Sequence, residues 1–212
     1  MNPYASINIA SWISRFQVFF IFALRIISLL VGERIILGID PGTNIMGYGV
    51  ISVRGNRLEL ITLGVLKLVK TDDHPRKLKH IFEKTQELLS VYRPDELAVE
   101  APFFGKNVQS MLKLGRAQGV AMAAALSRSV PIFEYSPRKI KQSITGKGSA
   151  SKEQVASMLK QLLAIHESPD YLDATDGLAV AVCHFFQKGN PGPEKKFSGW
   201  KGFLSVNSDR VT

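Results

Sequence analysis

The chain has 212 residues, 45% of them hydrophobic, which suits one domain with a sizeable core and some chain left over. Its net charge of +9 predicts a polyanionic partner, either nucleic acid or an acidic membrane surface. The single cysteine, Cys183, excludes an intramolecular disulfide, and no Cys/His cluster has the spacing of a structural zinc site.

The first 33 residues differ from the rest. Val18 to Val31 is almost wholly apolar, but Arg25 and Ser28 interrupt it, and a membrane span needs about 20 apolar residues. We therefore expect residues 1–33 to be an extension outside the working domain, explained by translation that starts at Val31; a membrane anchor is the alternative. The working domain is predicted over 34–188 and a tail over 189–212, in a cytoplasmic protein without stable membrane association.

The predicted elements describe an α/β protein. Three apolar runs separated by turn residues predict an antiparallel meander, and the later strands alternate with helices, which is typical of a mixed sheet. The predicted strands are 34–40, 47–53, 57–68, 96–100 and 130–135. The predicted helices are 75–92, 107–127, 137–144, 151–163 and 170–187. Together they form a mixed five-stranded sheet flanked by helices.

Four carboxylates stand at places where they could converge. Asp40 and Glu100 each end a predicted strand, and adjacent strands would hold them close together. Asp173 and Asp176 are three residues apart in the first turn of the last predicted helix, so they share one face. Plainer interpretations remain, because Asp40 could simply begin a turn and either Asp173 or Asp170 could cap the helix.

Four gathered carboxylates repel one another unless cations neutralise them, and Mg²⁺ prefers oxygen ligands. Two such ions about 4 Å apart can activate a water and stabilise a leaving 3′ oxygen. On a basic protein this chemistry predicts a nuclease that depends on Mg²⁺, with Mn²⁺ as a possible substitute.

Further stretches extend the pattern: Gly38-Ile39-Asp40-Pro41-Gly42, the strand ending at Glu100, Lys113 to Ala121, Phe133-Glu134-Tyr135, Gly148 to Val155, and Asp173-x-x-Asp176. Over residues 34 to about 188 this set resembles the RuvC family of crossover junction endodeoxyribonucleases. The resemblance implies an RNase H-like fold, a homodimer, and Mg²⁺-dependent symmetric nicking of Holliday junctions in recombination and repair. It also implies partnership with the RuvA–RuvB branch-migration complex.

The resemblance also assigns roles to single residues. It makes all four carboxylates ligands of two Mg²⁺ ions per subunit, and it places Lys141 and Lys152 beside the scissile phosphate as catalytic residues. It matches Phe103 to an aromatic that stacks on bases. Plainer alternatives remain, since Lys152 adjoins a capping-box signature, Lys141 could be an ordinary exposed residue, and Phe103 could pack in the core.

Other residues are candidates for DNA contact. We expect Lys106, Lys113 and Arg116 to line the groove between two sites, and Lys147 lies in a basic glycine-rich loop suited to phosphate. The small residues Gly115, Gly119 and Ala123 recur every four positions and predict close helix packing, either on the sheet or, as a dimeric family implies, on a partner subunit. His184 and Cys183 are expected in the core, and His74 on an exposed segment.

Three alternative functions remain open at this stage. The Asp-Pro-Gly-Thr turn also resembles the phosphate loop of actin and Hsp70-like ATPases, but those need two such domains. A non-catalytic junction-binding module is disfavoured because all four acids are present. A membrane-tethered nuclease depends wholly on residues 1–33.

Overall fold

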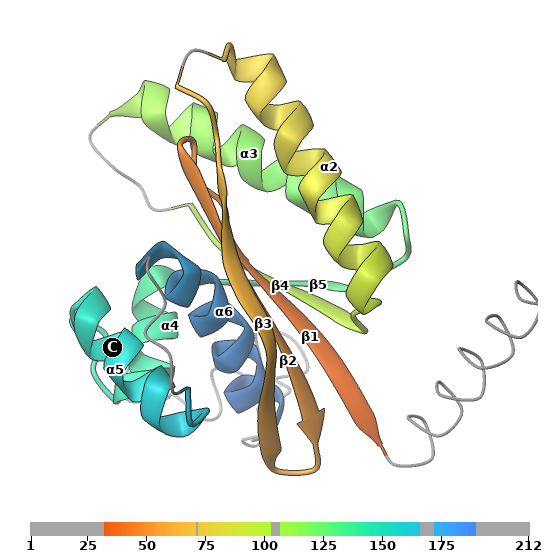
Figure 1. Ribbon diagram of the computed structural model, residues 1–212. Coiled ribbons are helices and arrows are strands. Elements are labelled where there is room, and N and C mark those ends of the chain that lie inside the picture. Colours follow the sequence, from red (N-terminus) through yellow and green to blue (C-terminus); the bar gives the residue numbers. More distant parts are fainter. Residues whose placement is uncertain (1–31, 71, 103–106, 166–171, 190–212) are drawn as a thin grey trace, which may run out of the picture.

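The computed structural model describes residues 32–70, 72–102, 107–165 and 172–189, which form one mixed sheet with helices on both faces (Figure 1). The strands are β1 (Glu33–Asp40), β2 (Ile45–Arg54), β3 (Arg57–Lys67), β4 (Glu96–Glu100) and β5 (Ile132–Tyr135). The helices are α2 (His74–Tyr92), α3 (Val108–Leu126), α4 (Pro137–Thr145), α5 (Lys152–Leu162) and α6 (Leu172–Gly189). The predicted fold class is confirmed.

The sheet has the order β3-β2-β1-β4-β5. The first three strands form the predicted antiparallel meander, and β4 and β5 run parallel to β1. β5 begins two residues later than predicted: Pro131 has no N–H to give to the sheet, and the Val130 N–H bonds to the Ala125 carbonyl at the end of α3.

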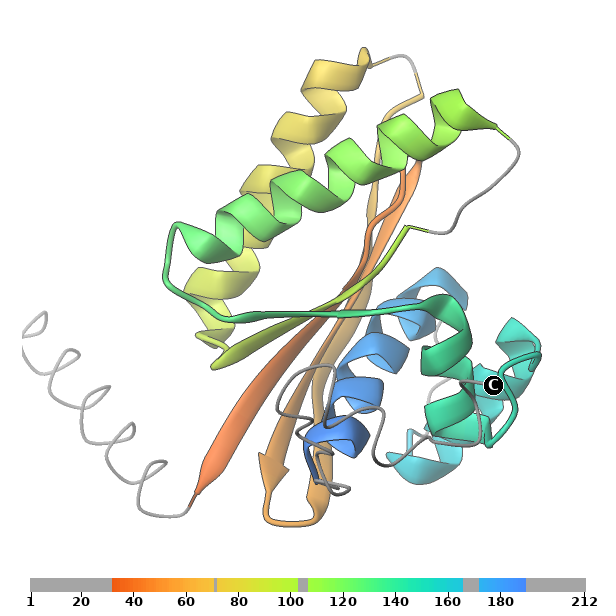
Figure 2. The same cartoon turned by 180° about the vertical axis from the view of Figure 1, so that it is seen from behind.

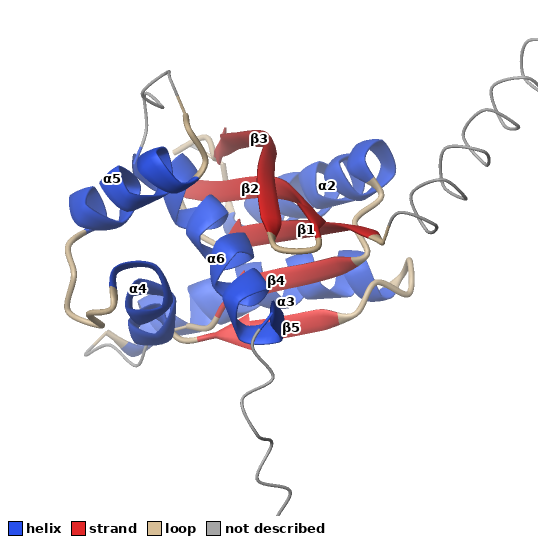
Figure 3. Cartoon of the chain, turned by 90° about the horizontal axis from the view of Figure 1, so that it is seen from below, coloured by secondary structure: helices blue, strands red, loops and turns tan. Residues whose placement is uncertain are grey.

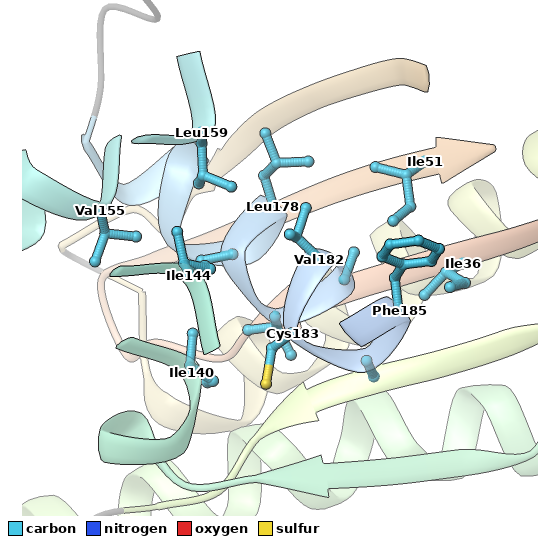
Figure 4. Close-up of a cluster of buried hydrophobic side chains, with 14 of the residues drawn as sticks. Ile36, Ile51, Ile140, Ile144, Val155, Leu159, Leu178, Val182, Cys183 and Phe185 are labelled. Atoms are coloured by element: carbon cyan, nitrogen blue, oxygen red, sulfur yellow. The ribbon is translucent and has the colours of Figure 1, made fainter. Parts of the chain in front are cut away.

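The helices form two layers. α2 and α3 cover one face of the sheet, and α6 lies across the other face with α4 and α5 packed against its outer side (Figures 1 and 2). Within the second layer, α6 lies directly on the sheet, and α4 and α5 pack against α6 (Figure 3). Figure 4 shows the core of this second layer, where Ile36 and Ile51 of the sheet meet Leu178 and Val182 of α6.

Side chains of β1 alternate between the two layers. Leu37 and Ile39 pack toward α2 and α3, whereas Ile36 packs toward α6. Gly38 also faces α6, since a Cβ there would lie 2.3 Å from the Gly177 carbonyl oxygen. Because side chains alternate along a strand, Asp40 is directed to the α6 layer as well.

Glycines allow α6 to approach the sheet very closely. A Cβ on Gly47 would lie 1.9 Å from the Asp173 carbonyl oxygen, and one on Gly49 would lie 2.5 Å from Leu178 Cα. On the helix side, a Cβ on Gly177 would lie 2.4 Å from the Tyr48 nitrogen. These neighbours are backbone atoms, which cannot move aside independently, so the glycines fix the position of the first turn of α6 over β1 and β2.

His184 is buried, as expected, and it belongs to a polar network that the sequence did not predict. Its Nε2 lies 2.8 Å from Glu96 Oε2, and the Tyr135 hydroxyl lies 2.6 Å from its Nδ1. Lys188 and Arg34 pair with the same carboxylate. The network ties β4, β5 and the end of α6 together, and Cys183 is buried beside it as predicted.

The predicted extension and tail lie outside the described residues, apart from residues 32, 33 and 189. The apolar run Val18 to Val31, on which the membrane-anchor alternative depends, is wholly outside them. Among the residues that are described, no helix combines the length and the apolar character that crossing a bilayer requires.

Candidate active site

Asp40 and Glu100 lie side by side at one edge of the sheet. β1 and β4 are parallel neighbours in which Ile39 pairs with Val99, so the next residue of each strand is a carboxylate. Ala98, two residues before Glu100, packs in the α6 layer, which directs Glu100 to the same face as Asp40. The prediction that the two carboxylates end adjacent strands is confirmed.

The N-terminal part of α6 brings Asp176 to this edge. A pocket of about 230 Å³ is lined by Asp40, Glu100 and Asp176, by Lys141 and Lys152, and by the less polar Pro137, Ile140, Val155 and Ala179. Five of the predicted site residues, from β1, β4, α4, α5 and α6, therefore share one pocket.

Burial and repulsion act on the two strand-end carboxylates. Burial raises the pKa of Asp40 to about 7, with the charges of Asp176 and Asp173 adding to the effect. Burial also raises the pKa of Glu100 to about 8, with Asp40 and Asp176 adding to it and Lys152 and Lys141 opposing it. The cluster therefore carries more negative charge than its surroundings stabilise, which is the situation that a bound divalent cation relieves.

Lys152 holds the two helix carboxylates. Its Nζ lies 2.5 Å from Asp176 Oδ2 and 3.4 Å from Asp173 Oδ1. Burial lowers the pKa of Lys152, but the hydrogen bond and charge of Asp176 outweigh that effect and raise it. Asp173 is thus brought to the cluster through Lys152. The capping box of Ser151 and Gln154 is present, and Lys152 is more than its solvated neighbour.

The negatively charged oxygens of the pocket all belong to carboxylates, which are the ligands that a hard divalent cation prefers, so these residues fit such an ion. As the side chains stand, no three Asp, Glu, His or Cys residues of the described ranges are grouped closely enough to hold one ion. The ammonium group of Lys152 lies within 4 Å of two of the carboxylates, those of Asp173 and Asp176.

Gln118 was missed as a site residue. It is buried on α3, and its Nε2 lies 3.3 Å from the Glu100 carbonyl oxygen and 2.9 Å from Glu134 Oε2. It therefore braces the backbone at the end of β4. The sequence signal was a polar residue among the apolar positions of a helix face.

The remaining predicted residues lie elsewhere. Lys147 is exposed in the loop after α4, and Lys113 and Arg116 are exposed on α3. Phe103 and Lys106 lie outside the described residues.

His74 lies on a segment whose neighbouring residues are mostly exposed, as expected, but it is itself only partly exposed, and its Nε2 is buried without a hydrogen-bond partner among the described residues. Burial lowers the pKa of His74, and the charges of Arg116, Lys113 and Lys77 lower it further. Lys77 in turn lies 3.3 Å from the Thr43 carbonyl oxygen, in the loop that follows Asp40. A basic cluster that includes both predicted α3 cations therefore adjoins the carboxyl end of β1.

Comparison with known proteins decides the family. The family described as "Crossover junction endodeoxyribonuclease RuvC" matches residues 36–184. The chain belongs to the RuvC family. Curated RuvC proteins of Cytophaga hutchinsonii and Bacteroides fragilis are each 62% identical to it, over 84% and 85% of this chain and 88% and 97% of theirs. A RuvC structure from T. thermophilus, in complex with Holliday junction substrate, matches with a TM-score of 0.69 and 33% identity, covering 74% of this chain and 95% of that one.

Membership of the RuvC family agrees with the pocket, since nuclease chemistry on a phosphodiester calls for the carboxylates and lysines found there. The RNase H-like fold implied by the resemblance is confirmed. The ATPase-related alternative is not favoured, and neither is a module without catalysis, because the matching family and the curated relatives are crossover junction endodeoxyribonucleases.

Proposed function

We propose that this RuvC-family protein resolves Holliday junctions by symmetric nicking, as a homodimer whose two pockets each bind two Mg²⁺ ions. The observation that supports this most directly is the pocket in which Asp40, Glu100 and Asp176 meet Lys141 and Lys152. The T. thermophilus relative, whose structure holds a junction substrate, supports the choice of substrate.

The carboxylates have the role of metal ligands, with Asp173 completing the set. These residues would hold Mg²⁺, which would supply Lewis-acid chemistry for the scissile phosphate and the attacking water, with Mn²⁺ as a substitute. Lys141 and Lys152 pair with phosphate oxygens, which fixes the strand in the pocket. Ile140, Val155 and Ala179 exclude bulk water from one wall, so these charges act in a medium of low polarity.

DNA contacts outside the pocket follow the basic residues. Lys113 and Arg116 bind backbone phosphates, and Lys77 extends that cationic surface toward the end of β1. Lys147 contacts phosphate from the loop after α4. Phe103 keeps the base-stacking role that the family resemblance implies, and Lys106 keeps the expected place in the groove between two sites.

The dimer interface that we propose is the uncovered side of α3, which crosses in front of the sheet in Figure 2. A line of apolar and small residues follows this side through five helical turns: Val108, Leu112, Gly115, Gly119, Ala123 and Leu126. Val108 and Leu126 are more than 60% exposed, and a Cβ on either glycine would meet nothing within 4 Å. Two-fold pairing of these surfaces suits a junction with two-fold symmetry.

The cellular setting is proposed from the family pattern: action in the cytoplasm, with junctions delivered by a RuvA–RuvB branch-migration complex.

The test is incubation of the purified protein with a synthetic four-way junction, with and without Mg²⁺. We expect paired nicks at opposed positions only with Mg²⁺. Asp40→Asn should retain junction binding while nicking falls by at least about 10³-fold, because the variant removes a charged ligand from the pocket. Random nicking of ordinary duplex, or an Asp40→Asn variant that cuts normally, would contradict the proposal.

A further inference from the structure

The ammonium group of Lys152 lies between two carboxylates that the proposed function assigns to metal ions. Nζ is 2.5 Å from Asp176 Oδ2 and 3.4 Å from Asp173 Oδ1, so one positive charge contacts both acids of α6. Oxygens that accept from an ammonium group have fewer lone pairs free for a cation. The pairing also puts a positive charge where a second positive charge would have to arrive.

The position of Lys152 also reduces repulsion in the rest of the cluster. Neighbouring acids repel the charged forms of Asp40 and Glu100, and the positive charge of Lys152 reduces that repulsion at both carboxylates. In the protein without metal, Lys152 therefore does part of what a bound cation would do.

The backbone of Lys152 is fixed, whereas its ammonium group can move. Ser151 and Gln154 form a complete capping box around the start of α5, which holds the Lys152 backbone in place. The Lys152 side chain is 51% exposed, while that of Asp176 is only 15% exposed. A flexible four-carbon stem in a half-exposed position can turn toward solvent or toward a ligand without disturbing the helix.

We propose that Lys152 is the built-in counter-ion of the metal-free site, and that one of the divalent ions binds only as its ammonium group withdraws from Asp173 and Asp176. The proposal rests on the proposed function, since that function supplies the metal site. Lys152 therefore weakens metal binding when no DNA is present. A DNA phosphate gives the released ammonium group a new partner, so DNA and this ion strengthen each other's binding by the same factor.

The experiment measures Mg²⁺ binding to the whole protein without DNA, by calorimetry and by the shift in melting temperature that Mg²⁺ causes. Lys152→Met removes the charge, Lys152→Gln removes the charge but keeps a hydrogen-bonding group, and Lys160→Met is the control. Lys160 is an exposed lysine in the last turn of the same helix, so its replacement causes the same change in net charge.

We expect both Lys152 variants to bind Mg²⁺ about tenfold or more tightly than the wild type, with a larger melting shift, because a like charge has left the site. Lys160→Met should bind as the wild type does. Unchanged or weaker Mg²⁺ binding in folded Lys152 variants overturns the inference. The junction assay separates the two proposals. Tighter Mg²⁺ binding by the Lys152 variants, together with no nicking by the wild type, would refute the proposed function alone. Normal nicking by the wild type, together with unchanged Mg²⁺ affinity in the Lys152 variants, would refute this inference alone.

Discussion

Replacing Gly177 by alanine tests whether close packing of α6 on the sheet sets the active site. The new Cβ would lie 2.4 Å from the Tyr48 nitrogen and 2.5 Å from the Gly47 carbonyl carbon, both backbone atoms. Ordinary contact needs about 3.5 Å, so the part of α6 around Gly177 must rise by about 1 Å. Asp176, the neighbouring residue, moves with it.

Two opposing effects set the stability change. Overpacking of this kind costs about 1–3 kcal/mol, and alanine recovers up to about 1 kcal/mol over glycine inside a helix. We expect a net loss of about 1–2 kcal/mol in the free energy of unfolding. A shift of about 1 Å in a catalytic group can cost about 10²-fold in rate, so nicking should fall by that order while junction binding persists.

Denaturant unfolding and the junction-nicking assay measure these two effects. Ser157→Ala is the control, because it is an exposed helix position on α5, away from the sheet and the proposed dimer interface. It should be at least as stable as the wild type. If Gly177→Ala unfolds with the wild-type free energy and nicks at the wild-type rate, close approach of α6 does not position the site.

Two further predictions concern the dimer and the buried network. Gly119→Leu should raise the dimer dissociation constant, measured by sedimentation, at least about tenfold, because a large side chain keeps the two α3 helices apart. The control Lys160→Leu on α5 should leave this constant unchanged. A Gly119→Leu protein that dimerises as the wild type does would show that the interface lies elsewhere. Burial raises the pKa of Glu96, but hydrogen bonds from Lys188 and His184 and the charge of Arg34 outweigh it and hold that pKa below 4.5. Glu96 then contributes stability that is present above pH 4.5 and lost as the pH falls through the folded pKa. The free energy of unfolding of Glu96→Gln at pH 7 should therefore be about 2 kcal/mol lower than that of the wild type. In denaturant titrations this difference should shrink below pH 4.5. A difference that stays constant down to pH 3 would contradict the stabilising role of the Glu96 charge.

The sequence by itself determined the order and type of the elements. Apolar runs with period two and turns rich in glycine and proline fix where strands begin and end, so the residue pattern alone placed Asp40 and Glu100 at strand ends. The spacing of Asp173 and Asp176 fixes their common helix face in the same way. These are local properties of the backbone, which neighbouring residues specify.

Only the tertiary structure decided which of these residues meet. Lys152 could be read as a solvated residue beside a helix cap until the packing of α5 on α6 brought its ammonium group to Asp176. His184 and Glu96 are 88 residues apart, and no spacing rule relates a strand residue to a helix residue at that distance. Gly38 and Gly177 likewise look like ordinary glycines until the sheet and helix surfaces meet. The physical reason is that contacts between elements depend on how their surfaces pack together in three dimensions, whereas sequence patterns report only which face each residue occupies.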